Sequence, residues 1–139
     1  PDLFCKPIAK TPRDREALRE AVFAGHPRLF FGSDSAPHPR HQKECLGCAA
    51  GVFSAPVALP GLAQLFESAG CLERLDGFVS SHARRFYRIT PPPRPVRLVD
   101  TPWQVPERYA TVTPFLAGQT LRWQVENHRY PPVFVDQQE

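Results

Sequence analysis

The chain has 139 residues, of which 42% are hydrophobic, and 17 basic against 14 acidic residues give it a formal net charge of +3. This length suits about one domain with a single core. The basic residues are scattered, so no block of like charge indicates a nucleic acid or an anionic membrane as partner. Every apolar run is interrupted well before the roughly 20 residues that cross a bilayer. The sequence therefore indicates a soluble protein.

The start of the chain and its cysteines bear on its context. The first residue is Pro1, no methionine occurs anywhere, and no signal-peptide pattern precedes the first apolar segment. We therefore expect the chain to be part of a larger protein. Four cysteines at irregular spacing favour free thiols in a reducing compartment and a cytoplasmic location.

Residues 3–34 contain the pattern of a strand, a helix and a second strand. Residues 3–8 are short and apolar, as in a buried strand. A helix is predicted to begin after Thr11 as N-cap, with Pro12 in its first turn, and to end near Gly25. Residues 28–34, RLFFGSD, are apolar on both faces, as a covered parallel strand must be. The three segments predict a βαβ unit with a right-handed crossover.

The rest of the chain contains helical patterns followed by strand patterns. After a long polar loop, residues 60–70 and 71–89 predict two helices, the first ended by Gly70. From Pro91 onward, short apolar runs around proline and glycine predict short strands and turns. We expect a barrel-type portion at residues 1–90 and an extension with short strands at residues 91–139.

Asp34 is the first candidate functional residue, because ligands of α/β proteins bind beyond the carboxyl ends of the strands. A carboxylate at the end of a buried strand costs free energy unless a metal or hydrogen bonds compensate it. It can therefore be a structural cap or a catalyst. His38 follows a rigid turn and can donate a hydrogen bond to an anionic ligand. The small residues at 49–51 let a backbone N–H approach the same ligand.

Two other interpretations of this loop compete with an active site. His38, His41, Cys45 and Cys48 have the side chains of a structural zinc site, but only three residues separate His41 from Cys45. Zinc-finger pairs lie a dozen or more residues apart. A redox pair at Cys45 and Cys48 is disfavoured because such motifs open a helix, whereas Gly47 and residues 49–51 resemble a loop.

The segment FFGSDSAPHPRHQKE, followed by CLGCAAGVFSAP, resembles the part after strand eight of class II dihydroorotases, the bacterial and fungal type of the amidohydrolase superfamily. FCKPIAK near the start and VTPFLAGQTLRWQV near the end resemble the same family. The resemblance implies an α/β fold, namely the C-terminal part of a (β/α)8 TIM barrel, with strands 7 and 8, their helices and a short β extension. It implies a zinc-dependent hydrolase of pyrimidine biosynthesis that interconverts N-carbamoyl-L-aspartate and L-dihydroorotate at two zinc ions.

The resemblance also implies roles for four residues. Asp34 matches the aspartate that binds zinc and acts as general base and acid, a role that suits a carboxylate held ionised beside cations. His38 matches the histidine on the substrate carboxylate, and Ala50 matches a residue whose backbone binds the same group. Lys6 occupies the position of a backbone contact to the pyrimidine ring, where the family residue is often apolar.

The other ligands of the family's zinc centre do not occur in this chain, which has no His-x-His. We therefore expect the chain alone to be inactive, with the N-terminal part of the barrel supplied by the same or another chain, and the enzyme to be a homodimer. A non-catalytic dihydroorotase-like subunit and another cyclic amidohydrolase remain as alternatives. Solvated or loop-bracing roles are expected for His41, Lys43 and Glu44, and a surface or packing role for His82. Packing roles are expected for Cys45, Cys48, Trp103 and Trp123.

Overall fold

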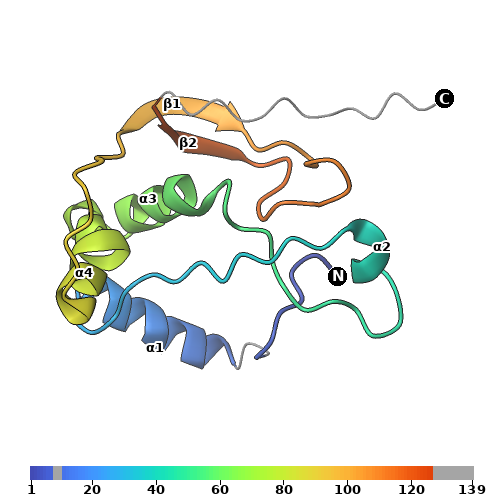
Figure 1. Cartoon of the computed structure of the whole chain (residues 1–139), viewed down its shortest axis with the longest axis horizontal. Coiled ribbons are helices and arrows are strands. Elements are labelled where there is room, and N and C mark those ends of the chain that lie inside the picture. Colours follow the sequence, from blue (N-terminus) through green and yellow to red (C-terminus); the bar gives the residue numbers. More distant parts are fainter. Residues whose placement is uncertain (8–10, 127–139) are drawn as a thin grey trace.

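The structure is a computed structural model that describes residues 1–7 and 11–126, with the helices before the strands in the chain (Figure 1). Helices α1, α2, α3 and α4 span Pro12–Phe23, Arg40–Lys43, Ala58–Ser68 and His82–Tyr87. A 3₁₀ turn at Leu72–Arg74 and a π-helical turn at Gly77–Ser81 connect α3 to α4. Strands β1, Leu98–Gln104, and β2, Thr120–Val125, form an antiparallel hairpin. No helix of the described residues is long and apolar enough to cross a membrane.

Helix α1 begins and ends where its sequence predicts. The Thr11 hydroxyl accepts a hydrogen bond from the Asp14 N–H, and the Asp14 carboxylate accepts one from the Thr11 N–H. This reciprocal capping box satisfies two N–H groups of the first turn. Gly25 follows the helix with a φ of 75°, which glycine adopts without steric cost.

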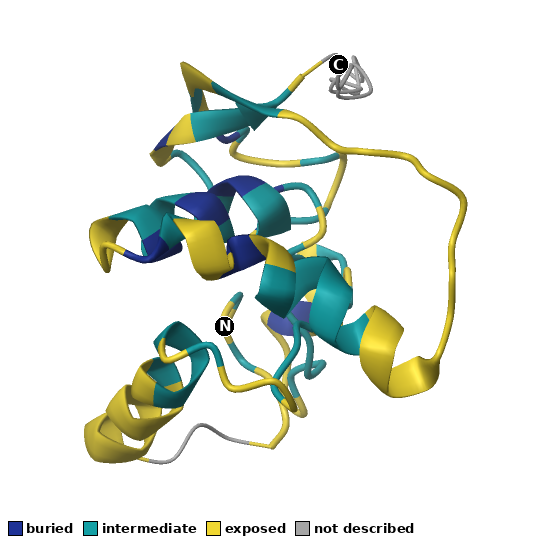
Figure 2. Cartoon of the chain, turned by 90° about the vertical axis from the view of Figure 1, so that its left-hand side faces the viewer, coloured by how far each residue is buried: buried dark blue, intermediate teal, exposed yellow. Residues whose placement is uncertain are grey.

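The main core lies around α3, whose buried residues stand out in Figure 2. Phe66 of α3 is completely buried and packs edge-on against Phe23 of α1, with ring centroids 5.3 Å apart. Leu98 and Trp123 of the hairpin pack against the same cluster. A second cluster joins Val57, Val105 and Leu121. Helix α3 is therefore the element on which both α1 and the hairpin rest.

The hairpin is fastened to α3 by polar contacts as well. The Arg122 guanidinium donates to both Asp100 carboxylate oxygens, at 2.8 and 2.6 Å, and to the Glu67 carboxylate at 2.7 Å. These hydrogen bonds hold the pKa of Asp100 below its usual range. Trp123 donates its indole N–H to the other Glu67 oxygen, at 3.0 Å. The Trp103 indole N–H donates to the Trp123 carbonyl at 2.8 Å, so both tryptophans have the expected packing roles.

The two predicted parallel strands do not form a ladder in the described residues. Residues 28–34 run extended across the molecule, and of the predicted strand at 3–8, Ile8 lies outside the described residues (Figure 1). Instead, Phe31 donates to the Phe78 carbonyl, and Gly51 donates to the Phe4 carbonyl. A β-strand exists only through its hydrogen-bonded neighbours. The hydrogen-bonded ladder expected of a βαβ unit is therefore absent from the described residues, although their extended path fits it.

The predicted helices and C-terminal strands agree more closely with the structure. Helix α3 starts two residues before the predicted 60–70, and Gly70 ends it with a φ of 68°. The 71–89 pattern is helical but broken by the π-helical turn. Both strands lie within predicted segments. The division at residues 90 and 91 stays a prediction, and residues 127–139 of the extension lie outside the described part.

Candidate active site

The loop that carries Asp34 and His38 is fastened to the segment before α3. The Ala36 N–H donates to the Val52 carbonyl at 3.1 Å. The Ser35 hydroxyl oxygen accepts hydrogen bonds from the backbone N–H groups of Ser54 and Ala55, at 3.1 and 3.0 Å. One hydroxyl thus satisfies two N–H groups that helix and strand ladders leave unused. These contacts fix the backbone on either side of the candidate residues.

Asp34 is exposed and has a φ of 41°, in the left-handed region that residues other than glycine seldom adopt. Aspartate tolerates this region better than most residues. Within the described residues no group forms a hydrogen bond or ion pair with its carboxylate. Asp34 follows the predicted strand, and its carboxylate is open to solvent in the structure. Uncommon backbone conformations of this kind cluster at functional sites.

His38 and Ala50, which the resemblance assigned to one ligand group, lie together in the structure. The His38 Nε2 is 3.2 Å from the Ala50 carbonyl oxygen. Since a carbonyl only accepts, Nε2 carries the hydrogen of this bond. The Nδ1 atom has no partner within the described residues. The half-buried imidazole is therefore oriented by one nitrogen and free to bind a ligand through the other.

Lys43, at the end of α2, is the one buried charged residue of the described chain, with 4% of its surface exposed. Its ammonium group donates to the carbonyls of Phe4, Ala49 and Gly51, at 3.0, 2.8 and 2.7 Å. These bonds hold the N-terminal segment, α2 and the 49–51 turn together. The expected loop-bracing role of Lys43 is confirmed, and it is more extensive than the sequence indicated.

Gly51 lies where the two halves of the loop approach most closely. A Cβ atom at this position would lie 2.5 Å from the Ala36 Cβ and 3.0 Å from the His38 Cδ2. Its φ of 151° is also one that side chains rarely permit. Glycine is thus required for His38 to sit against the 49–51 turn.

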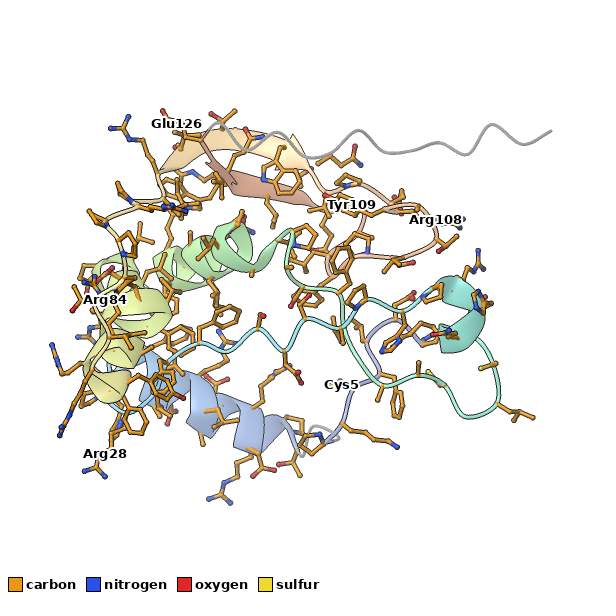
Figure 3. All side chains as sticks on the ribbon, viewed as in Figure 1. Cys5, Arg28, Arg84, Arg108, Tyr109 and Glu126 are labelled. Carbon is orange, nitrogen blue, oxygen red and sulfur yellow. The ribbon has the colours of Figure 1, made fainter. Side chains whose placement is uncertain are left out.

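Lys6 has an exposed side chain, and no described residue pairs with it. Its segment nevertheless reaches the site, because the neighbouring Phe4 carbonyl accepts hydrogen bonds from both Gly51 and Lys43. The side chain of the adjacent Cys5 is labelled in Figure 3. Only the backbone of this segment is thus placed beside the loop, and a role for Lys6 stays a prediction.

The C-terminal residues of the family resemblance also contact this loop. The Arg40 N–H donates to the Thr111 carbonyl at 2.9 Å, and the Phe115 N–H donates to the Phe53 carbonyl at 2.7 Å. Tyr109 packs edge-on against Phe53, from the segment between β1 and β2 (Figure 3). The segment between β1 and β2 therefore packs against the loop and supports it.

The described residues do not form a metal centre. No group of three or more histidine, cysteine or acidic side chains in residues 1–7 and 11–126 is arranged to hold an ion. The zinc-site interpretation of His38, His41, Cys45 and Cys48 is therefore wrong for this geometry. Asp34 alone offers one carboxylate, which does not fit a two-zinc centre without ligands from elsewhere.

Cys45 and Cys48 lack the helical context of a redox pair. Both thiols are free, and residues 44–50 follow α2 rather than open a helix. The Cys45 Sγ contacts the Gln42 carbonyl at 3.4 Å. His82 has the expected packing role, since its Nδ1 lies 3.0 Å from the Leu29 carbonyl and its ring covers Gly77.

Two residues that hold the site together carried no clear signal in the sequence. Lys43 contacts the Phe4 carbonyl, which is 39 positions away in the chain. The surrounding sequence, PRHQKE, is polar and does not predict that this lysine is buried. Gly51 stood out only as one of three small residues. The close contact with Ala36 that requires glycine becomes visible once the two segments are placed side by side.

Comparison with known proteins adds the evolutionary context. No family model matches the chain. It is 45% identical to a dihydroorotase of Yersinia enterocolitica over 130 residues, which are 91% of this chain and 37% of the relative. A dihydroorotase of Alkalilimnicola ehrlichii is 46% identical over 129 residues, or 90% of this chain and 38% of the relative.

Solved structures give the same result. The chain matches the crystal structure of a Campylobacter jejuni dihydroorotase with a TM-score of 0.80 and 45% identity, over 91% of this chain and 38% of that one. It matches a Saccharomyces cerevisiae dihydroorotase in complex with 5-fluoroorotic acid with a TM-score of 0.79 and 38% identity. That match covers 88% of this chain and 36% of the yeast chain.

The chain thus spans somewhat over a third of the length of these relatives, and both sequence and structure relate it to the dihydroorotases.

Proposed function

We propose that this chain forms one wall of a dihydroorotase active site and corresponds to the C-terminal part of the barrel. The reaction is the reversible cyclisation of N-carbamoyl-L-aspartate to L-dihydroorotate. The observation that carries this proposal is the joined loop in which His38 contacts Ala50 while Asp34 stays unpaired. Similarity at about 45% identity across that loop and its surroundings supports it.

In this proposal the substrate carboxylate binds where His38 meets the 49–51 turn. The Ala50 N–H and the free nitrogen of His38, when protonated, donate to the carboxylate oxygens. Backbone donors of fixed geometry bind an anion without the entropy cost of ordering long side chains. The Lys6 backbone would face the ring of the substrate.

Asp34 is proposed as the acid and base of the reaction. In ring opening, the proton released by the attacking water must reach the leaving nitrogen; the Asp34 carboxylate can accept this proton as a base and then donate it to the nitrogen as an acid. The unpaired, solvent-facing carboxylate suits this role because no structural hydrogen bond would be lost during proton transfer. Zinc would supply the activated nucleophile, with Asp34 as one ligand and the others outside this chain.

The test compares variants in the complete protein that carries this chain, assayed for dihydroorotate hydrolysis. Asp34→Asn keeps the shape of the side chain and removes its basicity, so we expect kcat to fall by at least a hundredfold. Asp76→Asn changes another exposed aspartate and should leave turnover unchanged. Equal rates for the two variants would refute the assignment of Asp34.

The incompleteness of the site gives a second test. The 139-residue chain alone, supplied with zinc, is expected to show no turnover of dihydroorotate, and measurable turnover would contradict this proposal. Wild-type protein that is complete but hydrolyses hydantoin rather than dihydroorotate would favour another cyclic amidohydrolase. A complete protein that binds 5-fluoroorotate without turnover would favour a non-catalytic subunit.

The cellular setting belongs to the same proposal. Four free cysteines fit the reducing cytoplasm. A homodimer of the complete protein is also proposed, and its mass in solution tests that assignment.

A further inference from the structure

The buried ammonium group of Lys43 has no role in the chemistry described so far. All three of its N–H bonds are used by carbonyl oxygens, and no carboxylate of the described residues pairs with it. A buried charge without an opposite partner costs stability. The positive charge therefore needs an explanation beyond bracing.

The orientation of one peptide group offers that explanation. The Ala49 carbonyl points at the Lys43 Nζ, 2.8 Å away. The Ala49–Ala50 peptide bond is trans, so its N–H points opposite to its carbonyl. The Ala50 N–H is consequently directed away from the ammonium group. No described residue accepts a hydrogen bond from it.

The neighbouring peptide group is oriented in the same manner by His38. The Ala50 carbonyl accepts from the His38 Nε2, and the Gly51 N–H on its opposite side donates to the Phe4 carbonyl at 2.9 Å. The Gly51 carbonyl then returns to Lys43 at 2.7 Å. Carbonyl groups on both sides of Ala50 are thus held by one cation, so a flip of either peptide group would break a hydrogen bond to Lys43.

A cation bound to a carbonyl also makes the N–H at the other end of the peptide unit a stronger hydrogen-bond donor, because hydrogen-bonded groups in series polarise one another. An anion on the Ala50 N–H would lie about 8 Å from the ammonium nitrogen, as the sum of two hydrogen bonds and one peptide unit. At this separation and a dielectric constant of about 20, the attraction corresponds to roughly thirtyfold in affinity.

We propose that Lys43 is a positioning residue for anion binding: it turns and polarises the Ala49–Ala50 peptide so that the Ala50 N–H binds the carboxylate of the substrate. This inference rests on the proposed function, since it assigns the same carboxylate to the same turn. The charge acts through the peptide group and never touches the ligand.

The experiment uses the complete protein with Lys43→Met, which keeps the length of the side chain and removes its charge. We expect the inhibition constant of 5-fluoroorotate and the KM for dihydroorotate to rise about tenfold to thirtyfold, while kcat changes less than threefold. The carboxamide of dihydroorotate has the ring without the charge, and its kcat/KM should change less than threefold. Gln42→Met alters the exposed neighbour on α2 and serves as the matched control.

Equal losses for the charged and uncharged ligands would overturn the inference and leave Lys43 as a brace. Should Lys43→Met fail to fold, Lys43→Gln keeps N–H donors without the charge and must show the same selective loss. The amide proton resonance of Ala50 should move downfield on binding 5-fluoroorotate in the wild type and by less in Lys43→Gln, and equal movement in both refutes the inference; a resonance that stays stationary in the wild type refutes the proposed carboxylate site instead. Absence of turnover in the wild type would instead refute the proposed function.

Discussion

Replacing Gly51 with alanine probes the tightest contact of the candidate site. The added Cβ would lie 2.5 Å from the Ala36 Cβ and 3.0 Å from both the Ala36 oxygen and the His38 Cδ2. Carbon atoms in contact normally lie 3.5–4.0 Å apart, roughly an ångström more. Neither the Ala36 Cβ nor its carbonyl is the end of a flexible side chain. The loop backbone must therefore move, and His38 with it.

The expected loss of stability has two parts. Overpacking a tight contact costs about 1–3 kcal/mol. A φ of 151° costs an alanine another ~1–3 kcal/mol, because this region is nearly exclusive to glycine. The free energy of unfolding should thus fall by about 2–6 kcal/mol. Since Ser35, Ala36 and Lys43 hold the surrounding segments by hydrogen bonds, little of this strain can relax locally.

The matched control is Gly47→Ala. Gly47 also has a positive φ, 82°, but nothing lies within 4 Å of its added Cβ. It should cost only the conformational strain, about 1–2 kcal/mol. Thermal unfolding of the complete protein measures both variants, at ~2–4 °C per kcal/mol. The KM for dihydroorotate should rise for Gly51→Ala alone. Equal melting temperatures and equal KM values for the two variants would refute the close approach of His38 to this turn.

Further outcomes follow from other parts of the structure. Because Arg122 lowers the pKa of Asp100 in the folded chain, the ionised carboxylate stabilises the hairpin above pH ~3.8. When the unfolding midpoint is measured against pH, this stabilisation should disappear as the pH falls below 3.8. The Asp100→Asn variant should not show that pH-dependent loss. Burial raises the pKa of Tyr109, so its contribution is complete below pH ~10 and lost as the pH rises through the folded value. The Tyr109 hydroxyl is buried and has no hydrogen-bond partner in the described residues. Tyr109→Phe should therefore leave the free energy of unfolding unchanged or raise it by up to ~1 kcal/mol. A decrease of more than ~1 kcal/mol would contradict this and show that the hydroxyl makes a stabilising hydrogen bond. Zinc should not protect the loop thiols from alkylation by iodoacetamide, and protection would restore the zinc-site interpretation of Cys45 and Cys48.

Some features could be predicted from the sequence because their causes are local. Thr11, Pro12 and Asp14 lie within one helical turn, and their capping contacts form wherever that helix forms. Gly70 ends α3 for an equally local reason, its positive φ. The apolar alternation of β1 and β2 placed both strands within their predicted segments. The position after a predicted strand made Asp34 and His38 candidates, but only the motif resemblance separated them from a capping aspartate and a loop histidine.

Other features needed the tertiary structure because they join segments far apart in the chain. Residues 28–34 have a strand pattern, but whether they form a strand depends on neighbours that the pattern does not contain. The Lys43 ammonium and the Phe4 carbonyl are 39 positions apart, and His38 and Ala50 are 12 apart. The sequence by itself determined which groups could bind an anion. Only the fold decided that a buried cation holds the Ala49–Ala50 peptide with its N–H turned outward, because a hydrogen bond depends on where two backbones lie in space.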